Sequence, residues 1–249
     1  MYKREDLTND SFITKFLAFV RRILGYAQLD YEDLEVYNVV PAEPEAGFIE
    51  MLPGKVWDEI EAIPNYILSS QNNQMTKETY LSSVIIWTVL SYILGFGDRH
   101  KGNVMITKSG RYANIDFGFI FGDDPHSFLE SYSRIPDCGI DEGDEEDILE
   151  KCKQIFILIR RYAPHIISFF SPIGDFPQKD PSKTGCDFSY VEKKLALDNV
   201  DCEAEEFIIA YVSKALNEKE QLARDIIHVL GKGWKSTVKY LYRMTGYSK

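Results

Sequence analysis

The sequence predicts an α+β fold of two unequal lobes, a small one with short strands and a larger, mainly helical one. Three features support this expectation. Two short β-rich runs, 34–40 and 47–52, are separated by a turn-rich stretch, which indicates antiparallel strands. The apolar run within 77–94 is broken by Ser and Thr and too short to span a membrane, so it reads as a buried helix. After Gly95 the order loop, strand, turn, strand predicts a hairpin with polar groups at both ends.

The other elements follow from periodicity. Apolar residues recur at helical spacing over 12–24, with Lys15, Arg21 and Arg22 between them, so an amphipathic helix is expected there. Thr76 is the expected N-cap of the helix 77–94. The acid-rich stretch 137–150 contains no Lys or Arg and is expected to be a solvated surface loop. The remaining helices are expected over 56–63, 148–162, 204–216 and 222–242.

Composition narrows the class of protein. The net charge of -11 argues against broad nucleic-acid binding, which relies on dense Lys and Arg opposite phosphates. The four cysteines, Cys138, Cys152, Cys186 and Cys202, form no CxxC pair, which fits reduced thiols better than disulfides or a zinc site. No secretion leader is recognisable in the first residues. A cytoplasmic protein is therefore expected.

The polar ends of the predicted hairpin carry the residue types that phosphoryl transfer requires. Mg²⁺ takes hard oxygen ligands from carboxylates and amides, and Asp98, Asn103 and Asp116 supply them. Protein kinases place four residues between the catalytic Asp and the metal-binding Asn, the spacing of Asp98 and Asn103, and a later DFG supplies the second metal ligand. Asn103 and Asp116 lie at the two ends of the hairpin segment, so they are expected to converge.

In this chain the histidine follows the Asp-Arg pair instead of preceding it. GDRHKGNVMI followed by NIDFGFIFG resembles the phosphoinositide 3- and 4-kinase superfamily, whose catalytic loop reads DRHxxN and whose metal-binding loop reads DFG. The resemblance implies a protein-kinase-like bilobal fold that uses ATP with Mg²⁺ or Mn²⁺. It assigns Asn103 and Asp116 to the metal ions. His100, assisted by Asp98, would accept the proton of the attacking hydroxyl, and Arg99 would brace the loop.

The resemblance extends toward the N-terminus. VYNVVPAEPEAGFIEML is similar to the family's strand pair ending in the adenine-binding hinge, which would be Glu50, Met51 and Leu52, with Tyr37 on the pocket wall. An ordinary buried strand is the alternative for these residues. YKREDLTND resembles the segment with a phosphate-binding lysine and a final aspartate that pairs with it, here Lys3 and Asp10. Its spacing is one residue shorter than usual, and Thr8-Asn9 replaces the usual Arg-Gln.

The resemblance divides the chain into a partial small lobe with the hinge, 1–52, and a large lobe, 53–249, that holds the catalytic loop, the DFG loop and a C-terminal helix. Because the chain begins two residues before Lys3, the phosphate-covering loop has no counterpart, and the small lobe is expected to be truncated. The sequence could be a fragment, a partner protein could complete the lobe, or the chain could be an inactive scaffold that binds regulators.

The segment after Asp116 most resembles the class III, vacuolar-sorting type of phosphatidylinositol 3-kinase, and FSYVEKKLALD agrees. Between Phe119 and Pro136 only Arg134 is a fixed cation, so unphosphorylated phosphatidylinositol is the favoured substrate. This implies lipid signalling and membrane trafficking, with peripheral attachment to endomembranes. A phosphatidylinositol 4-kinase and a related protein kinase remain alternatives. The helix 222–242, with Lys235, Lys239 and Arg243, would meet either an anionic membrane or the core.

Overall fold

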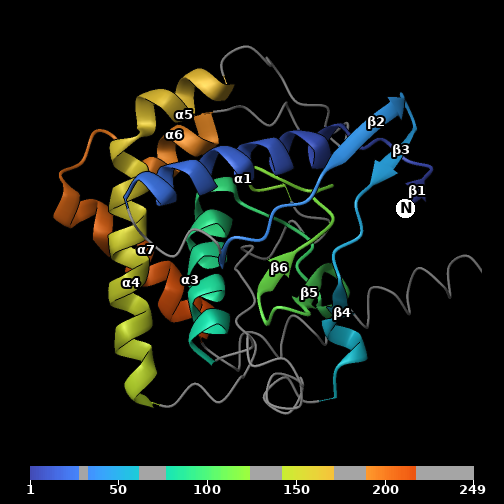
Figure 1. The fold of residues 1–249 in the computed structure, drawn as a ribbon. Coiled ribbons are helices and arrows are strands. Elements are labelled where there is room, and N and C mark those ends of the chain that lie inside the picture. The colour runs from blue at the N-terminus through green and yellow to red at the C-terminus, as the bar shows by residue number, and fades with distance from the viewer. Residues whose placement is uncertain (28–32, 62–76, 124–141, 171–188, 217–249) are drawn as a thin grey trace, which may run out of the picture.

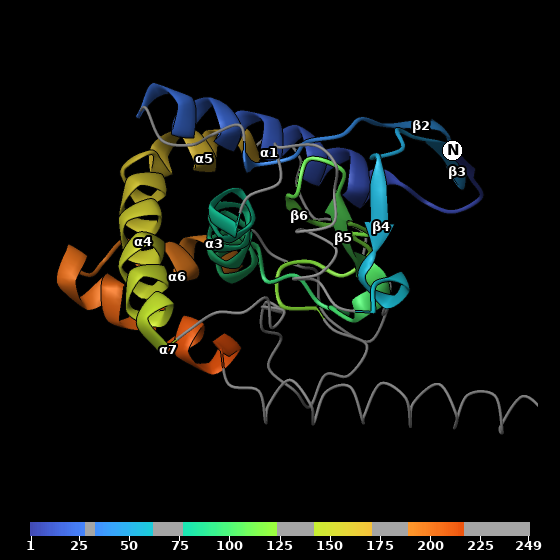
Figure 2. The same ribbon diagram turned by 60° about the horizontal axis from the view of Figure 1, so that its bottom comes forward.

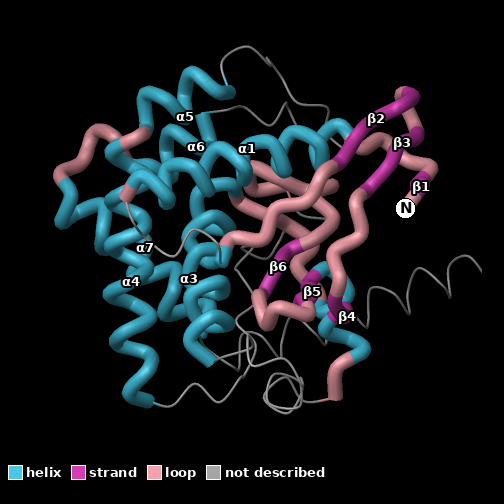
Figure 3. The backbone as a smooth tube through the Cα atoms, in the orientation of Figure 1, coloured by secondary structure: helices cyan, strands magenta, loops and turns pink. Residues whose placement is uncertain are grey.

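The computed structural model describes residues 1–27, 33–61, 77–123, 142–170 and 189–216, which fold into helices and two small sheets. The mixed α and β class predicted from the sequence is confirmed. Figure 1 shows the strands gathered on one side of the molecule and most helices on the other, and the secondary-structure colours of Figure 3 make the division clear. No helix within these ranges combines the length and apolar content needed to span a bilayer.

The first sheet has the strand order β1-β3-β2, and all its pairs are antiparallel. Its strands are β1 (Tyr2–Lys3), β2 (Val39–Glu43) and β3 (Ala46–Ile49). The predicted antiparallel pair is confirmed, but its first strand begins at Val39, later than the expected 34, and extends through Pro41 into the predicted turn. Proline is tolerated there because β2 is an edge strand, where a missing N–H need not break a ladder.

The second sheet has the order β4-β5-β6 and contains the predicted hairpin. Its strands are β4 (Gly54–Val56), β5 (Val104–Thr107) and β6 (Tyr112–Asn114). The helix predicted over 56–63 is wrong over its described part, because residues 54–56 pair with β5 and only the short 3-10 turn η2 (Trp57–Glu59) follows. Another 3-10 turn, η3 (Lys101–Asn103), leads into β5.

The helix α3 (Lys77–Leu94) is central to the molecule and confirms the predicted buried helix. It is buried around most of its circumference and contacts β6 and the helices α4 (Glu142–Arg161), α6 (Ser189–Leu195) and α7 (Asp201–Leu216). Figure 2 shows α3 between α4 and the second sheet. Ser83 ties the hairpin to this helix, because its Oγ accepts a hydrogen bond from the Tyr112 N–H at 2.8 Å. The expected cap, Thr76, lies outside the described residues.

Five further helices lie within the described residues, and Figure 2 shows the first of them running above both α3 and the second sheet. They are α1 (Thr8–Tyr26), α4 (Glu142–Arg161), α5 (Ala163–Phe170), α6 (Ser189–Leu195) and α7 (Asp201–Leu216). The helices predicted over 12–24, 148–162 and 204–216 are confirmed. Helix α4 begins at Glu142, inside the stretch predicted as an acidic loop, because acidic residues are favourable in the first turns of a helix. The predicted helix 222–242 lies outside the described residues.

Candidate active site

The loop after α3 folds back on itself around the carbonyl oxygen of Asp98. That oxygen accepts hydrogen bonds from the backbone N–H of His100 at 3.0 Å and from Nδ2 of Asn103 at 2.9 Å. Asp98 has a φ of 52°, in the left-handed region that non-glycine residues rarely adopt. Such strained residues often occur at functional sites.

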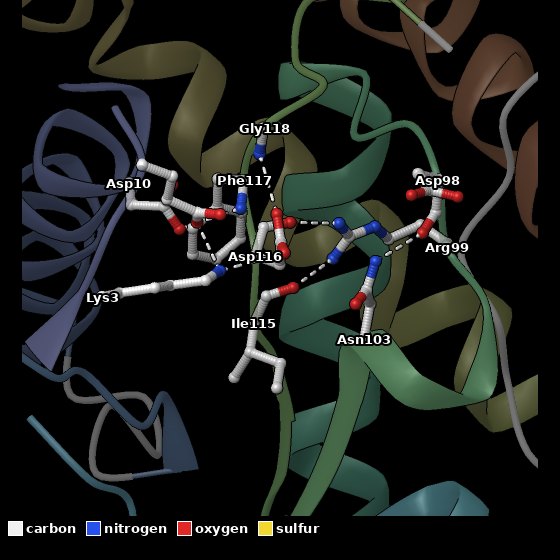
Figure 4. A network of polar contacts seen from close by, with 10 residues as sticks. Lys3, Asp10, Asp98, Arg99, Asn103, Ile115, Asp116, Phe117 and Gly118 are labelled. Carbon is white, nitrogen blue, oxygen red and sulfur yellow. Dashed lines mark hydrogen bonds and ion pairs between the residues drawn. The ribbon is translucent and has the colours of Figure 1, made fainter. Parts of the chain in front are cut away.

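Asn103 and Asp116 lie together at the open end of the β5–β6 hairpin, as expected. The Ile115 N–H donates to the Asn103 carbonyl oxygen at 3.1 Å, which joins the two segments directly before Asp116. Asp116 also has a left-handed φ, 60°, and its Oδ1 accepts the Gly118 N–H at 3.3 Å. The hairpin therefore brings an amide-bearing and a carboxylate-bearing residue to the same end of the sheet (Figure 4).

Arg99 joins the two loops through their backbones, in the bracing role expected for it. Its guanidinium donates to the carbonyl oxygens of Gly97 (2.7 Å), Ile115 (2.9 Å) and Asp116 (Figure 4). The side chain lies over the rings of Phe96 and Phe117, and the residue is only 7% exposed. Burial lowers the pKa of Arg99, while the neighbouring Asp116 opposes that shift.

Lys3 on β1 points toward the same site. Its ammonium pairs with Glu5 and lies 3.5 Å from Oδ2 of Asp116. Burial alone would lower the pKa of Lys3, but the carboxylates of Glu5, Asp116 and Asp10 outweigh it and raise the pKa. Lys3 forms no ion pair with Asp10, its expected partner.

Asp10 bonds instead to the segment around Asp116. At 5% exposure on the first turn of α1, it accepts the Phe117 N–H with Oδ1 at 3.0 Å (Figure 4). Burial raises the pKa of Asp10, although the Phe117 N–H and Lys3 favour the charged form. The N-terminal segment thus reaches the site as predicted, with both side chains directed at residues 116–117.

His100 lies at the start of η3, half-buried, and its Nδ1 accepts the Gly102 N–H at 2.9 Å. An accepting Nδ1 carries no proton, so the neutral ring carries its proton on Nε2. The proton acceptance expected of His100 therefore requires the ring to break its hydrogen bond with Gly102.

The predicted hinge connects the two sheets, because it follows β3 and precedes β4. Strand β3 ends at Ile49, and the Glu50 N–H bonds to the Asn38 carbonyl oxygen at 2.9 Å. Met51 is 64% exposed, and Leu52 packs partly against the core. This pattern does not fit the alternative of an ordinary buried strand.

Tyr37 is buried beside the site. Its ring stacks against that of Phe117 with a centroid distance of 6.5 Å. Burial raises the pKa of the Tyr37 hydroxyl far above its ordinary value. Tyr37 is therefore neutral and packs against the residue that follows Asp116.

The donor set at the end of the hairpin suits a hard divalent cation. Nδ2 of Asn103 bonds to Asp98, so Oδ1 remains the ligand atom of that side chain. Mg²⁺ is commonly held by one or two protein oxygens together with substrate phosphates and water. In the part of the chain that the structure describes, no group of three or more His, Cys, Asp and Glu side chains could hold a metal. A cation here would thus depend on Asn103, Asp116 and substrate oxygens.

Two features of the site were not predicted from the sequence. Glu5 is an ion-pair partner of Lys3, and the only sequence signal for this pair is the opposite charge two residues along, because the strand ends at Lys3 and the chain bends at Glu5. The ring of Phe117 packs against Trp87 and Phe96, with centroid distances of 6.1 and 5.0 Å. No local sequence pattern identifies these long-range ring contacts.

Comparison with known proteins supports the resemblance. Residues 65–173 match the family model described as phosphatidylinositol 3- and 4-kinase. The chain is 24% identical over 249 residues to the phosphatidylinositol 3-kinase catalytic subunit type 3 of Caenorhabditis elegans, covering 90% of this chain and 27% of the relative. It is 25% identical over 259 residues to the phosphatidylinositol 3-kinase VPS34 of Candida glabrata, covering 95% of this chain and 29% of the relative.

A further relative is the "Probable phosphatidylinositol 3-kinase VPS34 homolog" of Encephalitozoon cuniculi, 29% identical over 174 residues, or 65% of this chain and 38% of the relative. The chain thus spans less than two fifths of the length of these relatives. The matched residues include the catalytic loop, the hairpin and Asp116. These matches confirm the resemblance drawn from the sequence and assign residues 65–173 to the phosphatidylinositol 3- and 4-kinase family.

Proposed function

We propose that this chain transfers the γ-phosphate of ATP to the inositol headgroup of phosphatidylinositol, at the 3-position. The observation that carries the proposal is the convergence of Asn103 and Asp116 at the end of the hairpin, joined to the Asp98 loop by Arg99. Phosphoryl transfer depends mainly on positioning and electrostatic stabilisation, and this arrangement can supply both.

Each side chain has a role in the proposed reaction. Asn103 and Asp116 would hold Mg²⁺ or Mn²⁺, which when bound neutralises charge on the ATP phosphates. Lys3, beside Asp116, would contact the phosphates, and Asp10 would fix the N–H of Phe117. Asp98 and His100 would take the proton of the attacking hydroxyl. Tyr37 and residues 50–52 would line the adenine pocket.

The same reading gives the chain two lobes, 1–52 and 53–249, with the nucleotide between them. The position of residues 50–52 between the sheets supports this division, and the hydrogen bond that the Phe117 N–H donates to Asp10 on α1 joins the two proposed lobes. The enzyme would act as a peripheral protein on the cytoplasmic face of endomembranes. A regulatory or lobe-completing protein partner belongs to the same proposal.

Substrate preference follows from charge. Residues 119–136 contain Asp123, Asp124 and Glu130 against the single fixed cation Arg134, so the segment lacks the cations that would pair with the phosphates of an already phosphorylated inositide. The relatives named above are 3-kinases by name, which favours the 3-position.

The test is a labelled transfer assay with the purified chain, MgATP, and vesicles of phosphatidylinositol or its 4,5-bisphosphate. We expect phosphatidylinositol 3-phosphate by chromatography and little product from the bisphosphate. Equal rates on both lipids would contradict the charge argument, and a 4-phosphate product would identify a 4-kinase. Label in a peptide substrate instead of lipid would indicate a protein kinase, while a chain that binds no nucleotide would be a scaffold.

A further inference from the structure

The two loops of the site are also joined by backbone hydrogen bonds between the residues that precede Asp98 and those that follow Gly118. Residues 94–97, which lead to Asp98, lie beside residues 119–122, which follow the segment from Asp116 to Gly118. Three backbone hydrogen bonds join them: Gly97 N–H to Phe119 O (3.0 Å), Phe121 N–H to Leu94 O (2.7 Å) and Gly122 N–H to Gly95 O (2.9 Å). We call these three bonds the loop ladder.

One aromatic ring covers two glycines of the loop ladder. Gly95 and Gly122 have φ values of 56° and 82°, in the left-handed region that favours glycine. A Cβ added at Gly95 would lie 2.5 Å from the Cζ and Oη atoms of Tyr190, and one added at Gly122 would lie 2.6 Å from its Cε2. The ring of Tyr190 therefore packs directly against the backbone of Gly95 and Gly122, where a larger residue would not fit.

Tyr190 is itself held in place from α6. Lys194, one helical turn further along, lies on the same face of that helix. Its ammonium is 5.4 Å from the centroid of the Tyr190 ring and 4.8 Å from that of Tyr92 on α3. The cation between two aromatic rings fixes Tyr190 relative to α3, from which the catalytic loop departs.

We propose that Tyr190 is a positioning residue, whose ring presses the loop ladder together and thereby fixes Asp98 relative to Asp116. The argument is geometric. Gly97 directly precedes Asp98, and Phe119 follows Asp116 by three residues, so the ladder sets the spacing of the two aspartates together with Arg99, whose guanidinium also donates to the Gly97 carbonyl oxygen. Removing the ring would open the ladder bonds to water and leave the two loops joined by Arg99 and by the bond from the Ile115 N–H to the Asn103 carbonyl oxygen. The catalytic part of this inference rests on the function proposed above.

The first test needs no activity. In Tyr190→Ala, hydrogen exchange at the amides of Phe121 and Gly122 should accelerate by about tenfold or more, because their bonds lose cover. In Gly122→Ala, all three atoms nearest to the new Cβ would belong to the Tyr190 ring. The double variant should therefore lose less melting temperature than the sum of the two single losses. Once Tyr190 is Ala, the Gly122→Ala change no longer meets the ring and costs only the strain of its left-handed backbone. Unchanged exchange, or strictly additive losses, would overturn the proposal.

The second test separates positioning from general packing. Tyr211→Ala is the matched control, because Tyr211 also packs on Tyr92, at a centroid distance of 5.2 Å, but comes from α7. Tyr190→Ala should lower kcat for lipid phosphorylation by about 10- to 100-fold with little change in the KM for ATP. Tyr190→Phe and Tyr211→Ala should both have a kcat close to that of the wild-type chain. An equal loss in Tyr211→Ala would reduce Tyr190 to a packing residue. If the wild-type chain transfers no phosphate, the proposed function fails, while the exchange test still decides the role of Tyr190.

Discussion

At the scale of single residues, Asp10 is a buried carboxylate whose charge destabilises the fold. Its carboxylate is buried, and burial raises its pKa, with the nearby charge of Asp116 acting in the same direction. The unfolded chain loses this proton at a lower pH than the folded protein does. The charge of Asp10 therefore lowers the free energy of unfolding as the pH rises through the raised pKa, and it has no effect below the ordinary carboxyl pKa.

Two substitutions at Asp10 should act in opposite directions on stability. Asp10→Asn keeps an oxygen for the Phe117 N–H and removes the buried charge, so its melting temperature should exceed that of the wild type at neutral pH. The difference should vanish in acid. Asp10→Ala leaves that N–H without its acceptor and should cost about 1–3 kcal/mol. Thermal melts from neutral pH down to acid measure both effects. Equal destabilisation by Asn and Ala at neutral pH would show that the charge itself stabilises the fold.

At the scale of elements, the catalytic loop and the segment after β6 are joined by one side chain. Arg99 donates to three carbonyl oxygens that belong to both segments. Arg160 makes a comparable set of bonds at the connection between α6 and α7, to the carbonyl oxygens of Leu195, Ala196 and Asn199. The two arginines offer a natural comparison, because only Arg99 contacts the candidate site.

We expect Arg99→Lys to be destabilised by roughly 3 kcal/mol, because a compact ammonium lacks the planar fork with which the guanidinium reaches carbonyl oxygens on both segments, and it leaves buried acceptors unpaired. It should also lose phosphate transfer. Arg160→Lys should lose stability but retain turnover under conditions where it is folded. Urea unfolding and the lipid kinase assay on the same samples test this. Full activity in Arg99→Lys would show that the guanidinium does not position the two loops.

Elements with strong local signals could be predicted from the sequence. Helix α3 followed from a continuous apolar run, and the β5–β6 hairpin followed from two short strands around a Ser-Gly turn. The helix predicted over 56–63 failed because residues 54–56 pair with β5, about fifty positions away in the chain, and local periodicity carries no information on that pairing. The late start of β2 has the same cause, since its register is set by β3.

The site shows a similar division. The motif spacing predicted the convergence of Asn103 with Asp116 because both flank one hairpin. The bond from Asp10 to Phe117 and the pair of Lys3 with Asp116 connect residues more than a hundred positions apart. Only the resemblance to a family placed Lys3 and Asp10 at the site, and it paired them with each other instead of with Asp116 and Phe117.

At the scale of the whole molecule, the helices that contact α3 form a packed core. The reactivity of a buried cysteine on one of these helices measures how often that packing opens. Cys152 on α4 is buried, and burial raises the pKa of its thiol to about 12. Cys202 on α7 is exposed. Because the thiolate is the reactive form, Cys152 should react only when α4 separates from the core.

A thiol-specific alkylating reagent at neutral pH should therefore modify Cys202 rapidly in the native protein. Cys152 should be modified slowly, at a rate that urea increases in parallel with unfolding. Peptide mass spectrometry distinguishes the two sites, and Cys202→Ser serves as the matched control. Modification of Cys152 at the rate of Cys202 would contradict the packing of α4 against α3.

The central claim is that Asn103 and Asp116 together hold the cation on which phosphate transfer to phosphatidylinositol depends. The most direct measurement is the Mg²⁺-dependent turnover of Asn103→Ala and Asp116→Ala beside the wild type, with Asp198→Ala as an exposed control outside the site. We expect no detectable lipid phosphorylation in the first two variants at any Mg²⁺ concentration, because no neighbouring group replaces the lost oxygen. Asp198→Ala should match the wild type. Normal turnover in Asp116→Ala, with the fold intact by circular dichroism, would contradict the account.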